Sequence, residues 1–154
     1  MVNARSLVVA SLVSALMGLA SVTVVGADAT YHTSRYQLTA VGNETGTGTV
    51  INAHANGPQV AANENYLLIG AQPNTAYQVQ LVVYAGDPTC SSSPSFTVPS
   101  ATIQTNGTGN GHGKHRFTPA DVDGLHGATV GIVWQFMRNG QLAYQTGCET
   151  VVLD

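Results

Sequence analysis

Residues 128–153 read ATVGIVWQFMRNGQLAYQTGCETVVL and are the most sharply specified local element of the chain. The pair Asn139-Gly140 is typical of a tight type I′ turn, which predicts a hairpin joining 128–138 to 141–153. In the first arm, large apolar residues occupy every second position and share the face that we expect to line a core: Val130, Ile132, Trp134 and Phe136.

The second arm of this hairpin predicts an irregularity in its pairing. A two-residue turn pairs Trp134 with Gln145 and, continued without a break, brings the carboxylate of Glu149 onto the core face opposite Val130. A bulge near Gly147, or a residue or two earlier, would remove this conflict. We therefore expect the residues after the bulge to point inward: Cys148, Thr150 and Val152.

The rest of the chain carries signals of an all-β fold. Gly, Pro, Asn and Thr punctuate it throughout, and no stretch after the first 27 residues keeps a helical apolar period over three turns. Thr75–Ala85 alternates most clearly, and Thr118 with Pro119 predicts a single capped helical turn. Together these patterns predict a two-sheet, immunoglobulin-like β-sandwich of about seven to nine antiparallel strands with one disulfide.

The N-terminal segment is typical of an export signal. Arg5 precedes a mostly apolar run, and the small residues before position 28 suit a signal peptidase, so we expect residues 1–27 to be a signal peptide cleaved after Ala27, with Ala29 as the next option. The alternative is an uncleaved anchor, because a run of about 20 residues is long enough to span a bilayer. Cleavage leaves residues 28–154 as a single domain without a membrane segment, secreted or held in the cell envelope.

Cys90 and Cys148 are the chain's two cysteines. In an exported protein this number predicts one disulfide, which would close a loop of about 58 residues and stabilise the fold by ~4 kcal/mol in the chain-entropy model. The alternative is a pair of free thiols that serves a metal or catalysis. No CxxC motif occurs, and neither cysteine has a histidine close in sequence, so we expect the disulfide.

The composition disfavours nucleic-acid binding. The whole chain carries a net charge of −3, and loss of Arg5 with the leader makes it −4. Such a chain offers phosphates no basic field. Only 8% of its residues are charged, so neutral polar groups must cover much of the surface. A surface of this kind suits self-association or contact with a cell-wall polymer.

Two resemblances follow from short motifs. Ala71-Gln72-Pro73-Asn74-Thr75-Ala76-Tyr77, followed by a strand and then by Gly86-Asp87-Pro88-Thr89-Cys90, resembles part of the copper/zinc superoxide dismutases. That family joins its loop cysteine to one near the C-terminus, but the histidines that bind its copper have no counterpart here, since no histidine occurs between His54 and His112. The strand entry and the Thr-Asn-Gly-x-Gly-Asn-Gly hairpin also resemble uncharacterised secreted bacterial immunoglobulin-like sandwich proteins, which implies a fold and an extracellular address.

Few residues are candidates for chemistry. His112 and His115 form the densest histidine cluster, yet residues three apart on a strand point to opposite faces, which favours a mobile glycine-rich hairpin over a metal site. Asn43 and Asn106 each begin an N-glycosylation pattern within a predicted turn. We find no nucleophile elbow, phosphate loop or dinucleotide fingerprint, and we expect no cofactor.

The sequence therefore favours an exported, non-catalytic domain that binds a partner or builds a surface structure. Two alternatives stay open. One is a metal-binding or vestigial dismutase-like protein. The other is an enzyme whose site carries no recognisable motif, which a buried and strongly perturbed carboxylate or histidine in a cleft would favour.

Overall fold

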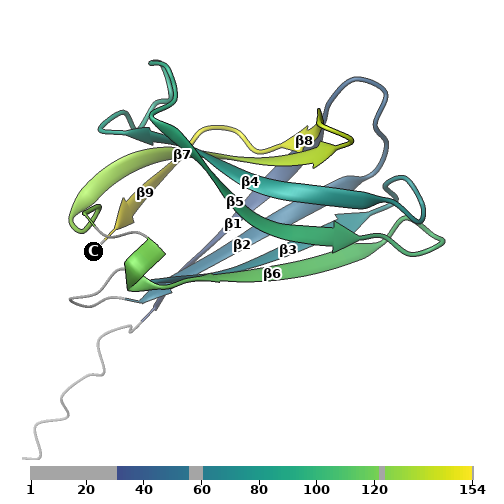
Figure 1. Cartoon of the computed structure of the whole chain (residues 1–154), viewed down its shortest axis with the longest axis horizontal. Helices are drawn as coiled ribbons and strands as arrows, with labels where there is room; N and C mark the ends of the chain where they lie inside the picture. Colours follow the sequence, from purple (N-terminus) through teal and green to yellow (C-terminus); the bar gives the residue numbers. More distant parts are fainter. Residues whose placement is uncertain (1–30, 56–60, 122–123, 154) are drawn as a thin grey trace, which may run out of the picture.

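The computed structural model describes residues 31–55, 61–121 and 124–153, so the predicted signal peptide lies outside the described residues. Nine strands and one short 3-10 turn make up this part of the chain (Figure 1). They are β1 (Tyr31–Ala40), β2 (Thr47–Ala55), β3 (Ala62–Ile69), β4 (Ala76–Ala85), β5 (Phe96–Gln104), β6 (Gly111–Phe117), η1 (Pro119–Asp121), β7 (Ala128–Arg138), β8 (Gln141–Gln145) and β9 (Glu149–Leu153). All the pairings between strands are antiparallel, which confirms the all-β prediction.

The strands form one nearly closed, barrel-like sheet rather than the clear two-sheet sandwich that we expected. Its order is β5-β4-β7-β8-β1-β2-β3-β6, with β9 paired to β7 beside this path. The end of β1 joins the two halves, because Thr39 and Ala40 pair with β8. At the other seam, Thr105 and Gly111 form a bridge at the base of the β5–β6 hairpin. These two connections turn the two expected layers into one continuous wall (Figure 1).

The β7–β8 hairpin has the predicted turn but two irregularities instead of one. Asn139 and Gly140 both have positive φ, 51° and 76°, as a type I′ turn requires. The first irregularity lies at Ala143, so that Ala143 and Tyr144 are both buried, and the second lies between Thr146 and Glu149.

Each irregularity adds one residue to the second arm of the hairpin, and together they give β9 the opposite orientation to the predicted one. One extra residue exchanges the two faces of a strand, and a second restores them. Cys148, Thr150 and Val152 are therefore exposed, and the prediction that they point inward is wrong. Val151, opposite Val130, and Leu153 face the core instead.

Strand β6 lies close to β5 because two of its residues are glycines. A Cβ atom at Gly111 or Gly113 would come within 2.7 or 2.8 Å of the side chain of Ile103. The Gly111–His115 segment, which we expected to form a glycine-rich hairpin, belongs to strand β6 of the β5–β6 hairpin. Its glycines permit the close approach that nearly closes the sheet.

Large aromatic side chains fill the middle of the interior. Those that are fully buried include Trp134, Tyr66, Tyr77, Tyr144 and Phe136. Tyr36 stacks on Trp134 with its ring centroid 4.9 Å away. Burying each such ring contributes about 1.5–3 kcal/mol, so this cluster contributes substantially to the stability of the fold.

The predicted disulfide is formed. Cys90 and Cys148 have their Cα atoms 5.9 Å apart and join the loop after β4 to the segment before β9. The bond lies over Gly131 of β7, where a Cβ atom would come within 2.7 Å of the Cys90 Sγ. The disulfide thus fastens an exposed loop to the outer face of the sheet, at the point where β8 gives way to β9.

Candidate functional site

A row of polar side chains crosses the inner face of four neighbouring strands. The pairings β1–β2, β2–β3 and β3–β6 align four residues in sequence: Ser34, Asn52, Glu64 and His115. Asn52 and Glu64 are buried, at 4% and 1% exposure, whereas Ser34 and His115 are half-buried. Their positions follow from the two-residue period of each strand, which places them in phase with buried apolar residues such as Val50 and Tyr66.

Glu64 is at the centre of this row and accepts hydrogen bonds from three side chains. Asn52 Nδ2 donates to Oε1 at 2.8 Å, and Trp134 Nε1 donates to both carboxylate oxygens at 3.0 Å. The hydroxyl of Tyr66 donates to Oε2 in a short contact. A buried indole N–H needs an acceptor, and Glu64 supplies it from the opposite side of the interior.

Burial raises the pKa of Glu64 above its usual value of 4.5, although its hydrogen bonds with Tyr66, Trp134 and Asn52 oppose the rise. The same burial, with the nearby carboxylate, raises the pKa of Tyr66 far above the ordinary value for tyrosine. Desolvation thus makes ionisation of the carboxyl less favourable than in water, whereas the three hydrogen bonds support the ionised form, and the Tyr66 hydroxyl stays protonated.

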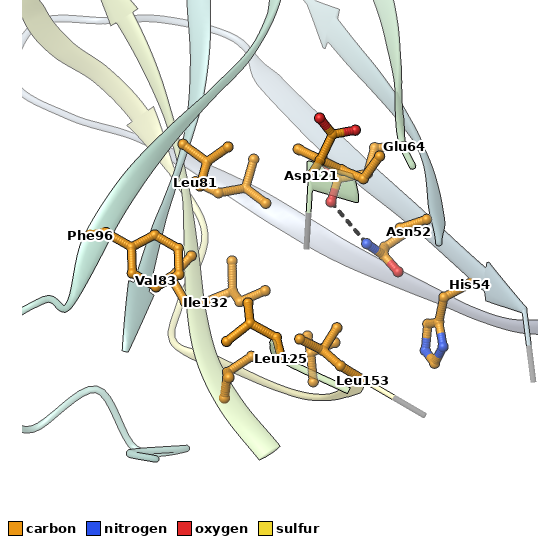
Figure 2. Close-up of a pocket in the computed structure, with 15 residues that line it drawn as sticks. Asn52, His54, Glu64, Leu81, Val83, Phe96, Asp121, Leu125, Ile132 and Leu153 are labelled. Atoms are coloured by element: carbon orange, nitrogen blue, oxygen red, sulfur yellow. Dashed lines mark hydrogen bonds between the residues drawn. The ribbon is translucent and has the colours of Figure 1, made fainter. Parts of the chain in front are cut away.

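An open pocket lies beside Glu64 (Figure 2). Its lining includes residues of η1 and β9, which lie at one end of the molecule (Figure 1). The wall opposite the polar row is apolar and is built by β4, β7 and β9: Leu81, Val83, Val130, Ile132, Val151 and Leu153. Asn52, His54 and Glu64 line the other side. Figure 2 shows Leu81, Val83 and Phe96 facing Asn52 and His54 across this space.

The pocket is small and its lining is mainly apolar, with Asn52, Glu64 and Asp121 among its few polar residues. Its volume is about 60 Å³, well below that of an engineered 150 Å³ cavity that binds benzene. Leu125 and Asp121 also line it, and the Asp121 carboxylate accepts hydrogen bonds from the backbone N–H and the hydroxyl of Thr118, which fixes the predicted helical turn. Such a space takes a few atoms of a largely apolar molecule that carries a polar group.

The histidine candidates lie on opposite faces of β6. His112 is exposed, whereas His115 is half-buried and packs edge-on against Phe117 with a centroid distance of 4.4 Å. Across the described ranges, no group of three or more His, Cys, Asp or Glu side chains is arranged to hold a metal ion. His112 and His115 are thus close in sequence but lie on opposite faces of the sheet.

The glycosylation candidates are both exposed and both lie in turns. Asn43 follows β1. Asn106 lies in the β5–β6 hairpin, where its Oδ1 accepts hydrogen bonds from the backbone N–H groups of Thr108 and Asn110. The side chain of Asn106 thus shapes the turn itself.

Sequence reasoning missed Glu64 and its pocket. The available signal was the alternation in Ala62, Glu64, Tyr66 and Leu68, which places Glu64 on the same face as two buried residues. The opposite face carries Asn63 and Asn65 but also Leu67 and Ile69, which are 40% and 49% exposed. Because both faces mix polar and apolar residues, the pattern did not say which one is buried.

Comparisons with protein-family models, curated proteins and solved structures found no match. Neither resemblance drawn from the sequence is tested by them. Among the described residues, no helix has the length and apolar character needed to cross a bilayer.

Proposed function

We propose that this chain is an exported, non-catalytic binding domain whose pocket beside Glu64 holds a small, largely apolar molecule. The observation that carries this proposal is an open pocket with a continuous apolar wall inside the sheet. Protein interiors are close-packed and leave few such spaces, and pockets of this composition are the usual sites for small ligands. The predicted signal peptide, together with a disulfide suited to an oxidising compartment, supports export.

The scaffold around the pocket is suited to binding without rearrangement. Strands, rather than loops, supply most of the lining, and the polar groups at the Glu64 wall already have hydrogen-bond partners. Within the described residues, no buried side-chain polar atom lacks a partner. A ligand therefore gains mainly by removing its own apolar surface from water, at about 25 cal/mol per Å².

Trp134 offers a direct test, because it is the single tryptophan and its indole N–H donates to Glu64 at the pocket wall. We expect a small neutral alcohol such as 1-butanol to shift the indole ¹H–¹⁵N resonance in a saturable way. Ala62→Leu, which places a larger side chain in the lining, should abolish this shift.

Ala76→Leu is the matched control, since Ala76 is exposed on β4 and does not line the pocket. It should bind as the parent does. A shift that never saturates in the parent, or that is the same in both variants, would refute the binding proposal.

A second candidate is an enzyme in which Glu64 acts as a general acid. The buried carboxyl with a raised pKa, in a pocket, is the observation that favours it. Three hydrogen-bonded side chains already occupy both of its oxygens, which favours a structural role over proton transfer. Turnover that is lost in Glu64→Gln, in a screen of hydrolysable esters and glycosides, would favour the enzyme.

A surface-structural role is supported by the position of β9. In the described pairings, β9 bonds only to β7, so its other edge is open to strand addition by a second copy or another chain. Size analysis at increasing concentration tests this role. A monomer at all concentrations would count against self-association and leave contact with a wall polymer to be tested by pull-down.

A further inference from the structure

The charges around the pocket have one sign. Glu64 lies in its wall and Asp121 at its lining, while no Lys or Arg is among the lining residues in the part of the chain that the structure describes. The basic side chains nearest in sequence to His115 are Lys114 and Arg116, which alternate with it on β6 and so belong to the outer face. A cation entering the pocket thus meets acceptors, and an anion meets like charge.

Two aromatic rings add to this preference. Phe96 and Phe117 line the pocket, and the faces of aromatic rings attract cations. The remaining titratable side chains that face Glu64 are Tyr66, His54 and His115.

Glu64 is able to accept a further donor without stranding a buried group. The Tyr66 hydroxyl lies 2.5 Å from Ser100 Oγ as well as close to Glu64 Oε2. Ser100 reaches this position because the β4–β5 register shifts between Gln78 and Gln80. Tyr66 therefore donates to Glu64 and can accept from Ser100, while the single Trp134 N–H is shared by both carboxylate oxygens. Three donors thus meet a group with about four acceptor sites, which leaves room for one more donor.

The size of the pocket limits what enters it. A volume of about 60 Å³ takes only a few non-hydrogen atoms, so a longer ligand must keep its remainder in the mouth. Because the carboxyl and the apolar wall face each other across this space, the entering part needs a polar head and a short hydrocarbon stem.

The geometry points to a primary ammonium group on a short alkyl stem as the ligand, which rests on the proposed binding function and deepens it. Glu64 is the counter-ion of this group. The hydrocarbon stem packs against the wall formed by Leu81, Val83 and Ile132. The ammonium N–H groups donate to the carboxylate, and the pairing favours the ionised form of Glu64. The rest of a larger molecule, such as an amine-bearing chain end, lies outside the pocket.

The test compares three ligands with the same hydrocarbon, namely butylammonium, 1-butanol and butanoate, at about pH 8. The indole ¹H–¹⁵N resonance of Trp134 reports binding. We expect butylammonium to bind about tenfold more tightly than 1-butanol, because charge-assisted hydrogen bonds are roughly twice as strong as neutral ones, and butanoate to bind most weakly. Added salt should weaken binding of butylammonium alone.

Glu64→Gln is the decisive variant, since its amide keeps the side chain's size and still accepts from Asn52 and Trp134. It should bind butylammonium no better than it binds 1-butanol. Glu149→Gln, which changes a carboxyl outside the lining, should keep the parent's preference.

The outcomes separate the two proposals. If 1-butanol binds and butylammonium binds no better, or if the preference survives in Glu64→Gln, the ammonium proposal is overturned and the binding function stands. If none of the three ligands gives a saturable shift, both are overturned. The salt series needs only the parent protein, so the test does not depend on how well any variant folds.

Discussion

At the scale of single residues, Glu64 and Trp134 depend on each other. The indole N–H is fully buried and requires an acceptor, and the carboxyl is 1% exposed and requires donors. They are 70 positions apart in sequence, on β3 and β7. Removing either partner would leave the other buried without its hydrogen bond, which costs about 1–3 kcal/mol for a neutral group and more for a charged one.

The raised pKa of Glu64 predicts how stability depends on pH. Between the ordinary value of 4.5 and the higher folded value, the folded protein binds more protons at this group than the unfolded chain does. The free energy of unfolding should therefore decrease as pH rises through this window, and the loss should be complete above the folded pKa. Urea denaturation across the pH series should show this decrease in the parent and a flatter profile in Glu64→Gln.

The difference between the two profiles isolates Glu64, because all other titrating groups are shared. Asp87 and Asp121, whose pKa values are lowered by hydrogen bonds with Thr89 and Thr118 respectively, act in the opposite direction in both proteins. If the free energy of unfolding changed with pH in the same way in both proteins, the pKa of Glu64 would not differ between the folded and unfolded states.

At the scale of elements, the joint between β8 and β9 decides which residues face the core. Thr146 holds this joint: its Oγ1 accepts the backbone N–H of Trp134 at 3.1 Å and donates to the carbonyl of Gly147 at 2.7 Å. Its own N–H donates to the Trp134 carbonyl at 3.0 Å. The side chain thus replaces a backbone partner where the second irregularity interrupts the regular ladder.

Thr146→Val removes this hydroxyl with little change of shape. We expect the variant to be less stable by about 1–3 kcal/mol, because the Trp134 amide loses its acceptor while staying buried. Thr129→Val, at an exposed position on β7, the strand that carries Trp134, is the control and should be near neutral. Equal urea midpoints for the two variants would contradict the role given to Thr146.

At the scale of the whole molecule, two features oppose opening of the sheet. The β1–β8 and β5–β6 contacts nearly close it, and the disulfide ties the loop after β4 to β9 across a sequence separation of 58. The apolar wall of the pocket comes from β4, β7 and β9, so the disulfide also fastens the strand that completes this wall. Strand β9 therefore contributes both to the pocket wall and to the stability of the fold.

The double variant Cys90→Ala/Cys148→Ala should lose about 4 kcal/mol of stability, the chain-entropy value for a loop of this length. Denaturation in urea measures the loss, and a reductant should lower the midpoint of the parent but not that of the variant. A variant as stable as the oxidised parent would show that the packing of β9 on β7 suffices without the bond.

Much of the fold was predictable because its signals are local. The turn at Asn139-Gly140, the alternation along β4 and the apolar face of β7 each depend on neighbours in sequence, and the structure confirms all three. The disulfide followed from two cysteines in a chain predicted to be exported, with no CxxC motif and no histidine close to either. By contrast, the two irregularities before β9 depend on what Thr146 and Ala143 meet on β7, and the single bulge that we expected gave β9 the wrong inner face.

The sequence by itself determined an all-β chain with its main hairpin and its one covalent link, because strand period, turn geometry and cysteine count are properties of short segments. Only the tertiary structure decided that the two layers join into one nearly closed sheet and that Glu64 meets Trp134 beside an apolar pocket. The residues that make these contacts lie on β2, β3, β4, β7 and β9. They are stabilised by burial, which arises only when these strands pack together. Burial is a property of the assembled sheet, so the candidate site became visible only there.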